Sequence, residues 1–547
     1  MKSKVFKKVL AGFLILLMAV SAMTGCASQS VSSGDKSKKI KLTIAFPKAE
    51  SSWEKDDYFR YITDKANINI DFRTMPSSSA MEKARIWINA GDMPDALYMT
   101  NLNIGEYLQY GEQGLIKAMP ADFDEKYPNL GFANAMTGVY SEIKERANGE
   151  LYVVLRPSDH YKLFINEFRQ AYAEGKDLRE MMDDPRYMYL DMMGFAYRKD
   201  WAEQLGIKTD LIMDYDDVMD MALKFKEADL GGVGKENTVG IAVDYTEAPN
   251  VFVRAFNPRY KYFHKDENGK YICGLLEEST TVGLRAYVDA YRKGIISPSF
   301  YTQRSSDLNS VFCSQKAGII YGKASIVDFR KLYSDFEHAN PGLVGSECLD
   351  ICWFRTPDGN VAGFQSANGG TSGWLFNPDL SDEKLARFLE LADYCSSPEG
   401  GPQVRLGVPD KDYKYENGEY VVTREKNAEG VWPNLNEVYP SYDLFRYLGN
   451  PHFEMPVDSN PYTYERANAL IEAKRGCNMV MTDWDTDLNF YQADDYAKFS
   501  AAYDVNNMFA EIVVSKGDTD ALWEAKRAEL KPQAESVAAN MNAALIK

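Results

Sequence analysis

Residues 90–98, Ala-Gly-Asp-Met-Pro-Asp-Ala-Leu-Tyr, join a helix to a strand and decide how this chain begins to fold. Upstream of them, apolar side chains recur with helical spacing over residues 81–88. Gly91 suits the end of that helix, and Pro94 prevents the helix from resuming. Residues 96–99 are then an apolar run that predicts a short buried strand.

The same alternation of strand and helix extends along the chain from this turn. Residues 41–46 and 68–72 alternate apolar and polar side chains, which predicts two strands upstream. Downstream, residues 150–155 and 195–198 are expected strands, and residues 381–393 carry the apolar stripe of an amphipathic helix. Strands separated by helices favour an α/β fold, with parallel sheets covered by helices on both faces.

Three Asn-Gly or Asp-Gly pairs stand between strand-like runs, at Asn268-Gly269, Asp358-Gly359 and Asn417-Gly418. These pairs favour the tight turns of β-hairpins, because their residues accept positive φ angles. Residues 519–546 have a helical pattern, so the chain is expected to close on a helix.

The amino terminus has the composition of an export signal. Four lysines within residues 2–8 precede an apolar run over residues 9–20. That run is too short to cross a bilayer core, which needs about 20 residues. The basic start and the short apolar run therefore indicate a signal peptide over residues 1–25 and not a membrane span.

Met23-Thr24-Gly25-Cys26 ends this segment and resembles a bacterial lipobox, with Met23 where Leu is usual. In a lipobox the cysteine carries a diacylglycerol, so Cys26 is the expected lipidation site and the extracytoplasmic face of the cell membrane the expected location. Residues 26–39 are rich in serine and lysine and lack aromatic residues, which predicts a flexible tether. An ordinary signal peptide that contains a cysteine is the alternative.

Charge and length bound the function of the exported body. The 547-residue chain has a net charge of −18, which becomes −22 once the four signal lysines are removed. Such an acidic body argues against nucleic acid and anionic lipid as partners. The length favours more than one lobe.

Six cysteines follow Cys26: Cys273, Cys313, Cys348, Cys352, Cys395 and Cys477. An exported chain can form disulfides, but six cysteines allow about 15 pairings and the sequence does not choose among them. In a chain of this size we favour buried free thiols, which an anaerobic habitat would permit.

Several short motifs, each weak alone, together resemble family 1 of the extracellular solute-binding proteins, which serve sugar importers. Residues 90–98 are similar to the family's GD-x-PD turn and strand, and residues 114–116 (Gly-Leu-Ile) to the end of its next helix. Further similarities follow in the same order: Tyr127-Pro-Asn-Leu130, Asn148-Gly-Glu-Leu-Tyr152, Tyr197-Arg-Lys-Asp-Trp201, Leu205-Gly-Ile207, Tyr291-Arg-Lys-Gly-Ile-Ile296, Lys316-Ala-Gly-Ile319 and Gly373-Trp374. The long insertions look most like the large lipoprotein branch found in Gram-positive bacteria.

This resemblance implies a type II periplasmic-binding fold, in which two α/β lobes with interleaved chain crossings enclose a ligand cleft. The expected divisions are residues 40–156 and 372–430 in the first lobe, and 157–371 and 431–547 in the second. Closure on a solute would be a population shift, because the ligand contacts both lobes only in the closed state. The implied partners are a small solute and a membrane ABC permease, and the protein is expected to be a monomer.

A carbohydrate, in particular an oligosaccharide, is the expected ligand. Sugar rings lie on aromatic faces, and aromatic residues make up 13% of the chain, although large rings are ordinarily core. We expect aromatic contacts from Trp53 and Trp374, with Trp432 a weaker candidate. Polar contacts are expected after the third strand and at the first lobe crossing, from Thr100, Asn101, Asn103, Asp159 and His160. A solvated loop that caps the next helix is the alternative for the first three.

No cofactor or metal is expected. In some relatives the segment around Asp229 is a calcium loop, but here Gly231 and Val233 stand where ligands would be. Calcium needs about six to eight oxygen ligands, so this loop is not expected to hold it tightly. His160 has no second histidine nearby, which disfavours a metal role.

Three sequence signatures of catalysis are missing: the phosphate-binding G-x-x-x-x-G-K-[ST] loop, the G-x-S-x-G elbow and the H-E-x-x-H zinc motif. We therefore expect binding and not catalysis. Two carboxylates suffice for a glycosidase, so a lipid-anchored glycoside hydrolase is one alternative. A lipoprotein that reports its solute to a membrane kinase is the other.

Overall fold

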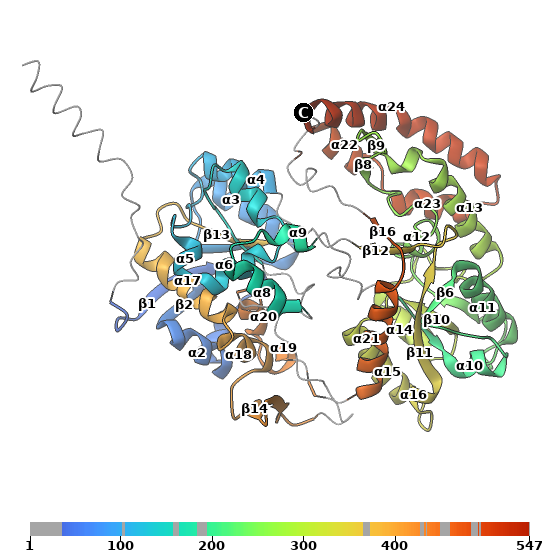
Figure 1. Cartoon of the computed structure of the whole chain (residues 1–547), viewed down its shortest axis with the longest axis horizontal. Helices are drawn as coiled ribbons and strands as arrows, with labels where there is room; N and C mark the ends of the chain where they lie inside the picture. The colour runs from blue at the N-terminus through green and yellow to red at the C-terminus, as the bar shows by residue number, and fades with distance from the viewer. Residues whose placement is uncertain are drawn as a thin grey trace, which may run out of the picture.

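The computed structural model describes residues 35–100, 104–156, 164–182, 194–364, 372–426, 432–433, 435–448, 460–482, 491 and 494–545. These residues form two bodies of helices and strands that lie side by side (Figure 1). Each body has a large hydrophobic core of its own. We call them lobe 1, which contains the first strand, and lobe 2, which contains the last helix.

Lobe 1 is built on a mixed five-stranded sheet. From one edge to the other its strands are β2 (Ile68–Phe72), β1 (Ile40–Ala45), β3 (Ala96–Met99), β13 (Gly373–Phe376) and β4 (Val154–Leu155). β1 runs parallel to β2 and β3, whereas β13 runs antiparallel to β3 and β4. β3 and β4 therefore point the same way, and their carboxyl ends lie at one edge of the sheet.

Local signals explain where two helices of lobe 1 begin and end. Gly91 adopts φ 66° and ends α3 (Ala80–Ala90), a conformation that costs glycine little. Ser381 caps α17 (Asp382–Ser396), because its hydroxyl accepts from the Lys384 N–H at 3.4 Å. The other helices of this lobe are α2 (Asp57–Thr63), α4 (Ile104–Glu112), α5 (Phe123–Lys126), α6 (Pro128–Ala135), α7 (Tyr140–Arg146), α18 (Gly400–Leu406), α19 (Leu435–Val438) and α20 (Tyr442–Arg446).

Lobe 2 has a second mixed sheet, in the order β6 (Ile212–Asp214), β11 (Leu349–Arg355), β5 (Phe195–Arg198), β10 (Ala317–Tyr321) and β7 (Val239–Ala242). β5 runs antiparallel to both of its neighbours, while β10 and β7 are parallel. Around this sheet lie α10 (Lys199–Gln204), α11 (Tyr215–Ala228), α12 (Ala248–Phe252), α13 (Glu278–Arg292), α14 (Ser305–Cys313), α15 (Ile326–Ala339), α16 (Gly345–Cys348), α21 (Pro461–Arg475), α22 (Asp494–Ala502), α23 (Val505–Val514) and α24 (Thr519–Leu545).

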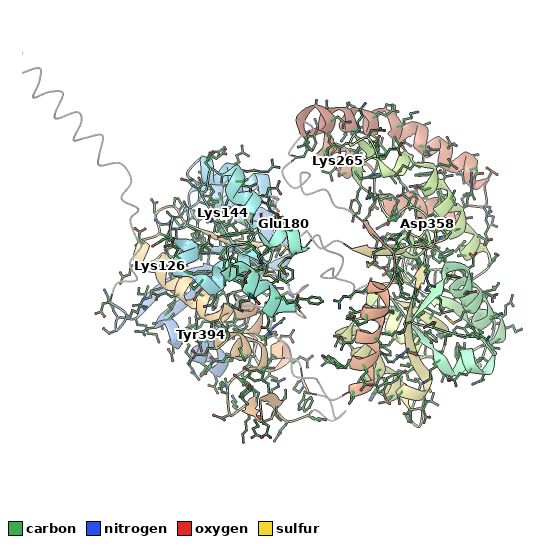
Figure 2. The ribbon with its side chains drawn as sticks, in the orientation of Figure 1. Lys126, Lys144, Glu180, Lys265, Asp358 and Tyr394 are labelled. Atoms are coloured by element: carbon green, nitrogen blue, oxygen red, sulfur yellow. The ribbon has the colours of Figure 1, made fainter. Side chains whose placement is uncertain are left out.

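The packing differs from the expected lobe divisions at two places. α8 (Ile165–Ala173) and α9 (Leu178–Met182) follow residue 157 but pack against α6, through Phe168 and Leu178 on Phe132 and Met136. They therefore lie on lobe 1, and Figure 2 shows Glu180 of α9 on the side of lobe 1 nearest lobe 2. Residues 435–448, expected in lobe 2, also belong to the core of lobe 1. The chain thus changes lobe between residues 182 and 194, 364 and 372, and 448 and 460.

Two of the three expected hairpins are present. β8 (Phe263–Lys265) pairs with β9 (Tyr271–Cys273), and β14 (Tyr413–Glu416) pairs with β15 (Glu419–Val422). At the third position the tight turn forms, with the Gly359 N–H donating to the Thr356 carbonyl oxygen at 2.8 Å. The hairpin is wrong, because β12 (Val361–Phe364), which follows the turn, pairs in parallel with β16 (Met479–Thr482) and not with β11. The expected strand at residues 150–155 is also shorter than predicted, since only β4 is paired.

The remaining expectations concern the cysteines and the amino-terminal segment of the chain. All six cysteines after Cys26 are free thiols, and five of them are buried. The end of the predicted tether is held against lobe 1, since the Arg387 guanidinium donates to the carbonyl oxygens of Asp35 (2.7 Å) and Lys38 (3.3 Å). Residues 1–34, which include Cys26 and the signal peptide, lie outside the described residues. Within the described part, no helix has the length and hydropathy to cross a membrane.

Candidate functional site

The candidate site lies where the chain passes between the lobes. In lobe 1, Arg156 directly follows β4 and its N–H donates to the Ser372 carbonyl oxygen at 2.8 Å, so the end of β4 and the start of β13, where the chain returns from lobe 2, lie at one sheet edge. In lobe 2, Gly194 directly precedes β5 and lies beside the end of β10. The Gly322 N–H, just after β10, donates to the Gly194 carbonyl oxygen at 2.9 Å. Carboxyl ends of strands in open α/β sheets are common ligand sites.

Aromatic rings form a continuous stack from the core of lobe 1 to this edge. Trp374 lies 5.9 Å from Phe46 and 5.2 Å from Tyr98 between ring centroids. Tyr98 in turn stacks on Tyr447 at 5.1 Å and 17°. The Arg156 guanidinium closes the stack, with its Cζ 4.4 Å from the Tyr447 ring centroid. The stack holds a cationic group in a fixed plane at the edge of the sheet.

Within this stack, burial and the Arg156 charge affect the pKa of Tyr98 in opposite directions. Burial raises the pKa of the Tyr98 hydroxyl well above its usual value, while the nearby Arg156 charge opposes that shift. The phenol therefore stays protonated at all ordinary pH values and is available only as a neutral hydrogen-bonding group.

A second cationic group gathers in lobe 2, on the segment that follows the carboxyl end of β7. Arg254 is 1% exposed, and its charge acts on Tyr321 at the end of β10. Lys261, seven residues further on, is exposed at the surface, and partial loss of hydration together with the Arg254 charge lowers its pKa, with Glu247 opposing.

The two lobes also contact each other directly. Arg475, at the end of α21 in lobe 2, lies over the Phe164 ring of lobe 1, with its Cζ 4.6 Å from the ring centroid. This contact joins the start of α8 to lobe 2.

Two candidate residues from the sequence lie in the core. Trp374 is fully buried in β13, and Trp53 is 6% exposed in a 3-10 turn (Ser51–Lys55), where it packs on Phe46 and Phe72. Packing accounts for both rings, because neither offers an open face to a ligand. Their expected role as ligand contacts does not match these positions.

The other candidates have different placements. Thr100 is half-buried directly after β3, at the sheet edge where Arg156 lies. Trp432 is half-buried away from that edge, and its indole N–H donates to the Arg424 carbonyl oxygen at 3.1 Å while Lys426 lies over its ring. Asn101, Asn103, Asp159 and His160 lie outside the described residues.

The carboxylate of Asp229 is held by hydrogen bonds within the loop that follows α11. Its carboxylate accepts from the backbone N–H groups of Val233 (3.1 Å) and Gly234 (3.0 Å) and from the Thr238 hydroxyl (2.8 Å). These donors occupy the oxygens that a cation would need. Among the described residues, no group of three or more His, Cys, Asp or Glu side chains could hold a metal ion.

Sequence reasoning missed the residues that build the two cationic groups. Arg156 could have been noticed, because it stands alone between an apolar strand and Pro157 in an acidic chain. Tyr447 had no such local signal, since it joins Arg156 only through packing between distant segments.

Comparisons with known proteins agree with this architecture. No protein-family model matches the chain. Lipoprotein LipO of Bacillus subtilis is 23% identical over 483 residues, which cover 85% of this chain and 82% of that protein. The polygalacturonan/rhamnogalacturonan-binding protein YtcQ of Bacillus subtilis is 20% identical over 432 residues, or 77% and 76% of the two chains.

Among solved structures, the Streptococcus pneumoniae ABC-transporter substrate binding protein FusA in complex with kestose has a TM-score of 0.58. The match has 16% sequence identity and covers 91% of this chain and 96% of that chain. The fold is therefore that of the type II periplasmic solute-binding proteins, as the sequence predicted. The predicted kinship is confirmed as well: the homologues of this chain are lipoproteins and ABC-transporter substrate-binding proteins.

Proposed function

We propose that this protein is the lipid-anchored substrate-binding component of an ABC importer and captures a carbohydrate between its two lobes. The observation that carries the proposal is the meeting of two separately packed lobes at sheet edges that carry oriented aromatic and cationic side chains. A ligand held by both edges would stabilise the closed arrangement, because only there does it contact both lobes.

The ligand proposed is an oligosaccharide. YtcQ is named for binding polygalacturonan and rhamnogalacturonan, and FusA was solved with kestose. On this chain, Thr100 and the Tyr447 ring lie at the edge where a sugar would bind. Asn101, Asn103, Asp159 and His160 stay proposed contacts from the sequence alone. A micromolar affinity corresponds to about −8 kcal/mol, which stacking and charge-assisted hydrogen bonds can supply.

The anchor proposed is a diacylglycerol on Cys26, which would hold the body on the outer face of the cell membrane as a monomer beside a permease. Its support is the lipobox-like sequence and the lipoprotein name of LipO. Labelled palmitate should be incorporated into the parent protein and not into Cys26→Ser, which should be released from the membrane. Equal membrane retention of both proteins would contradict the anchor.

Binding is tested by calorimetry against neutral and acidic oligosaccharides, with small-angle scattering before and after saturation. We expect one site per chain, a smaller radius of gyration in the complex, and about 2.7 kcal/mol of added stability at a ligand concentration 100 times Kd. Unchanged sugar must be recovered after incubation. Recovery of cleaved sugar would contradict the proposal and favour a hydrolase.

A further inference from the structure

We propose that lobe 2 has a second binding site, a cavity between α11 and α13 that takes an organic ammonium cation. This site goes beyond the carbohydrate capture proposed above and is built by one lobe alone. Figure 1 shows α11 and α13 on the side of lobe 2 that faces away from lobe 1. The cavity has a volume of about 350 Å³, within the range of about 300–1,000 Å³ that small-molecule sites have.

The floor of the cavity is apolar and contains two aromatic rings that meet at a steep angle. The ring centroids of Tyr215 and Phe256 lie 5.4 Å apart, with 77° between the ring planes. The rest of the floor is aliphatic, from Met219, Leu223, Ala286, Ala290 and Ile295. The electron-rich face of an aromatic ring attracts a cation, and the apolar floor favours a cation that carries alkyl or aryl groups.

Tyr215 brings an unpaired polar group to this floor. The residue is only 6% exposed and lines the cavity, so what remains of its accessible surface faces that space. Among the described residues its hydroxyl has no hydrogen-bond partner, and the oxygen is still open to solvent. Buried polar groups nearly always have a partner. A ligand N–H in the cavity would supply the one that this hydroxyl oxygen lacks.

The protonation state of that hydroxyl is fixed. Burial raises the pKa of the Tyr215 phenol far above its usual value, and the charges of Asp216 and Asp289 add to the shift. Both carboxylates line the same cavity. A cation in the cavity would therefore meet a neutral hydroxyl and negative charge on one side, and ring faces on the other.

Three carboxylates stand at the rim of the cavity, and two of them already have a lysine. Asp220 pairs with Lys224 at 2.7 Å. Asp289 pairs with Lys293, also at 2.7 Å. The Asp216 carboxylate has no ion pair or hydrogen bond with any described residue. The rim is thus left with one uncompensated negative charge beside two aromatic rings, which matches a monocation.

A metal ion fits this cavity poorly. Calcium needs about six to eight oxygen ligands, whereas the cavity offers one unpaired carboxylate and one phenol. The described part of the chain contains no cluster of three or more His, Cys, Asp or Glu side chains suited to a metal. An organic ammonium ion needs only a counter-charge, a hydrogen-bond acceptor and ring faces.

Calorimetry with matched cationic and neutral probes tests the inference on the mature protein. The cations are 2-phenylethylammonium and choline, and their neutral counterparts are 2-phenylethanol and 3,3-dimethylbutan-1-ol. We expect at least one cation to bind at one site per chain, about tenfold more tightly than its counterpart, and to lose that advantage in high salt. Asp216→Asn should weaken cation binding about tenfold and leave the affinity for the neutral probe unchanged. Phe256→Leu, which removes one ring face, should weaken binding of the same cation.

The matched control is Asp217→Asn, which removes the same charge from the next residue of α11. Asp217 is exposed and does not line the cavity, so this variant should bind the cation as the parent does. Circular dichroism melts establish that each variant folds. Equal losses in Asp216→Asn and Asp217→Asn would show that general surface charge attracts the cation, and would overturn the site.

Three further outcomes would also overturn it: neutral probes that bind as tightly as the cations, calcium chloride that displaces the bound cation at equal concentration, or no binding of either cation. None of them bears on carbohydrate capture, which is measured separately with oligosaccharides. Asp216→Asn should bind oligosaccharide with the affinity of the parent, because its cavity lies on the far side of lobe 2.

Discussion

Replacing Trp374 with alanine separates a core role for this ring from a ligand role. The ring is fully buried and lies within about 6 Å of Phe46, Tyr98 and Phe388 between centroids. Its indole N–H donates to the Tyr447 carbonyl oxygen at 3.3 Å. Truncating a buried tryptophan to alanine costs about 3–5 kcal/mol, because the cavity closes only in part.

That loss should appear as a lower melting temperature for lobe 1. For a domain of 150–250 residues, each kcal/mol shifts the melting temperature by about 2–4 °C, which predicts a decrease of roughly 6–20 °C. Differential scanning calorimetry should show the shift in the transition of lobe 1 and little change in that of lobe 2, since the two cores are separate.

Trp374→Phe is the matched control, because it keeps a ring and loses only the indole N–H and part of the volume. It should be destabilised by less than half as much as Trp374→Ala. Ligand affinity of either variant, measured well below its melting temperature, should stay within a few-fold of the parent. A Trp374→Ala protein that melts with the parent but no longer binds sugar would refute this reasoning and make Trp374 a ligand contact.

The remaining predictions concern two carboxylates. Asp229→Ala should lower the free energy of unfolding by about 1.5–3 kcal/mol, because charge-assisted hydrogen bonds are lost. Neither EDTA nor added calcium should change the melting temperature of the parent protein. A melting temperature that rises with calcium would contradict the prediction that Asp229 holds no cation. Asp95→Ala should also lower the free energy of unfolding, measured with urea, by about 1.5–3 kcal/mol. The reason is that Asp95 accepts from the Thr43 N–H at 2.8 Å and pairs with Lys384 at 2.8 Å. An unchanged midpoint of urea unfolding would show that neither contact stabilises lobe 1.

Elements with strong local signals were predicted correctly. β2 spans the predicted residues 68–72, and α3 ends at Gly91, because side-chain periodicity and a positive φ at glycine depend only on neighbours along the chain. Ser381 caps α17 for the same reason. The hairpin predicted at Gly359 failed, since its dipeptide favours a tight turn but cannot choose the partner of the strand that follows.

The candidate site was predicted less well than the fold. The sequence located it after β3 and at the first crossing, and Thr100 does lie at that edge. It could not distinguish a buried Trp374 from an exposed one, because a tryptophan in an apolar strand has the same pattern in either case. Nor could it pair Arg156 with Tyr447, which lie far apart along the chain.

By itself, then, the sequence determined the α/β class, the kinship with solute-binding proteins and the end of α3 at Gly91, since each follows from contiguous residues or from the order of motifs. Only the tertiary structure decided which rings are core, which lobe holds α8 and α9, and which arginine stacks on Tyr447. Burial and ion pairing depend on the side chains that surround a residue in space, and in this chain those neighbours come from segments that the lobe crossings separate.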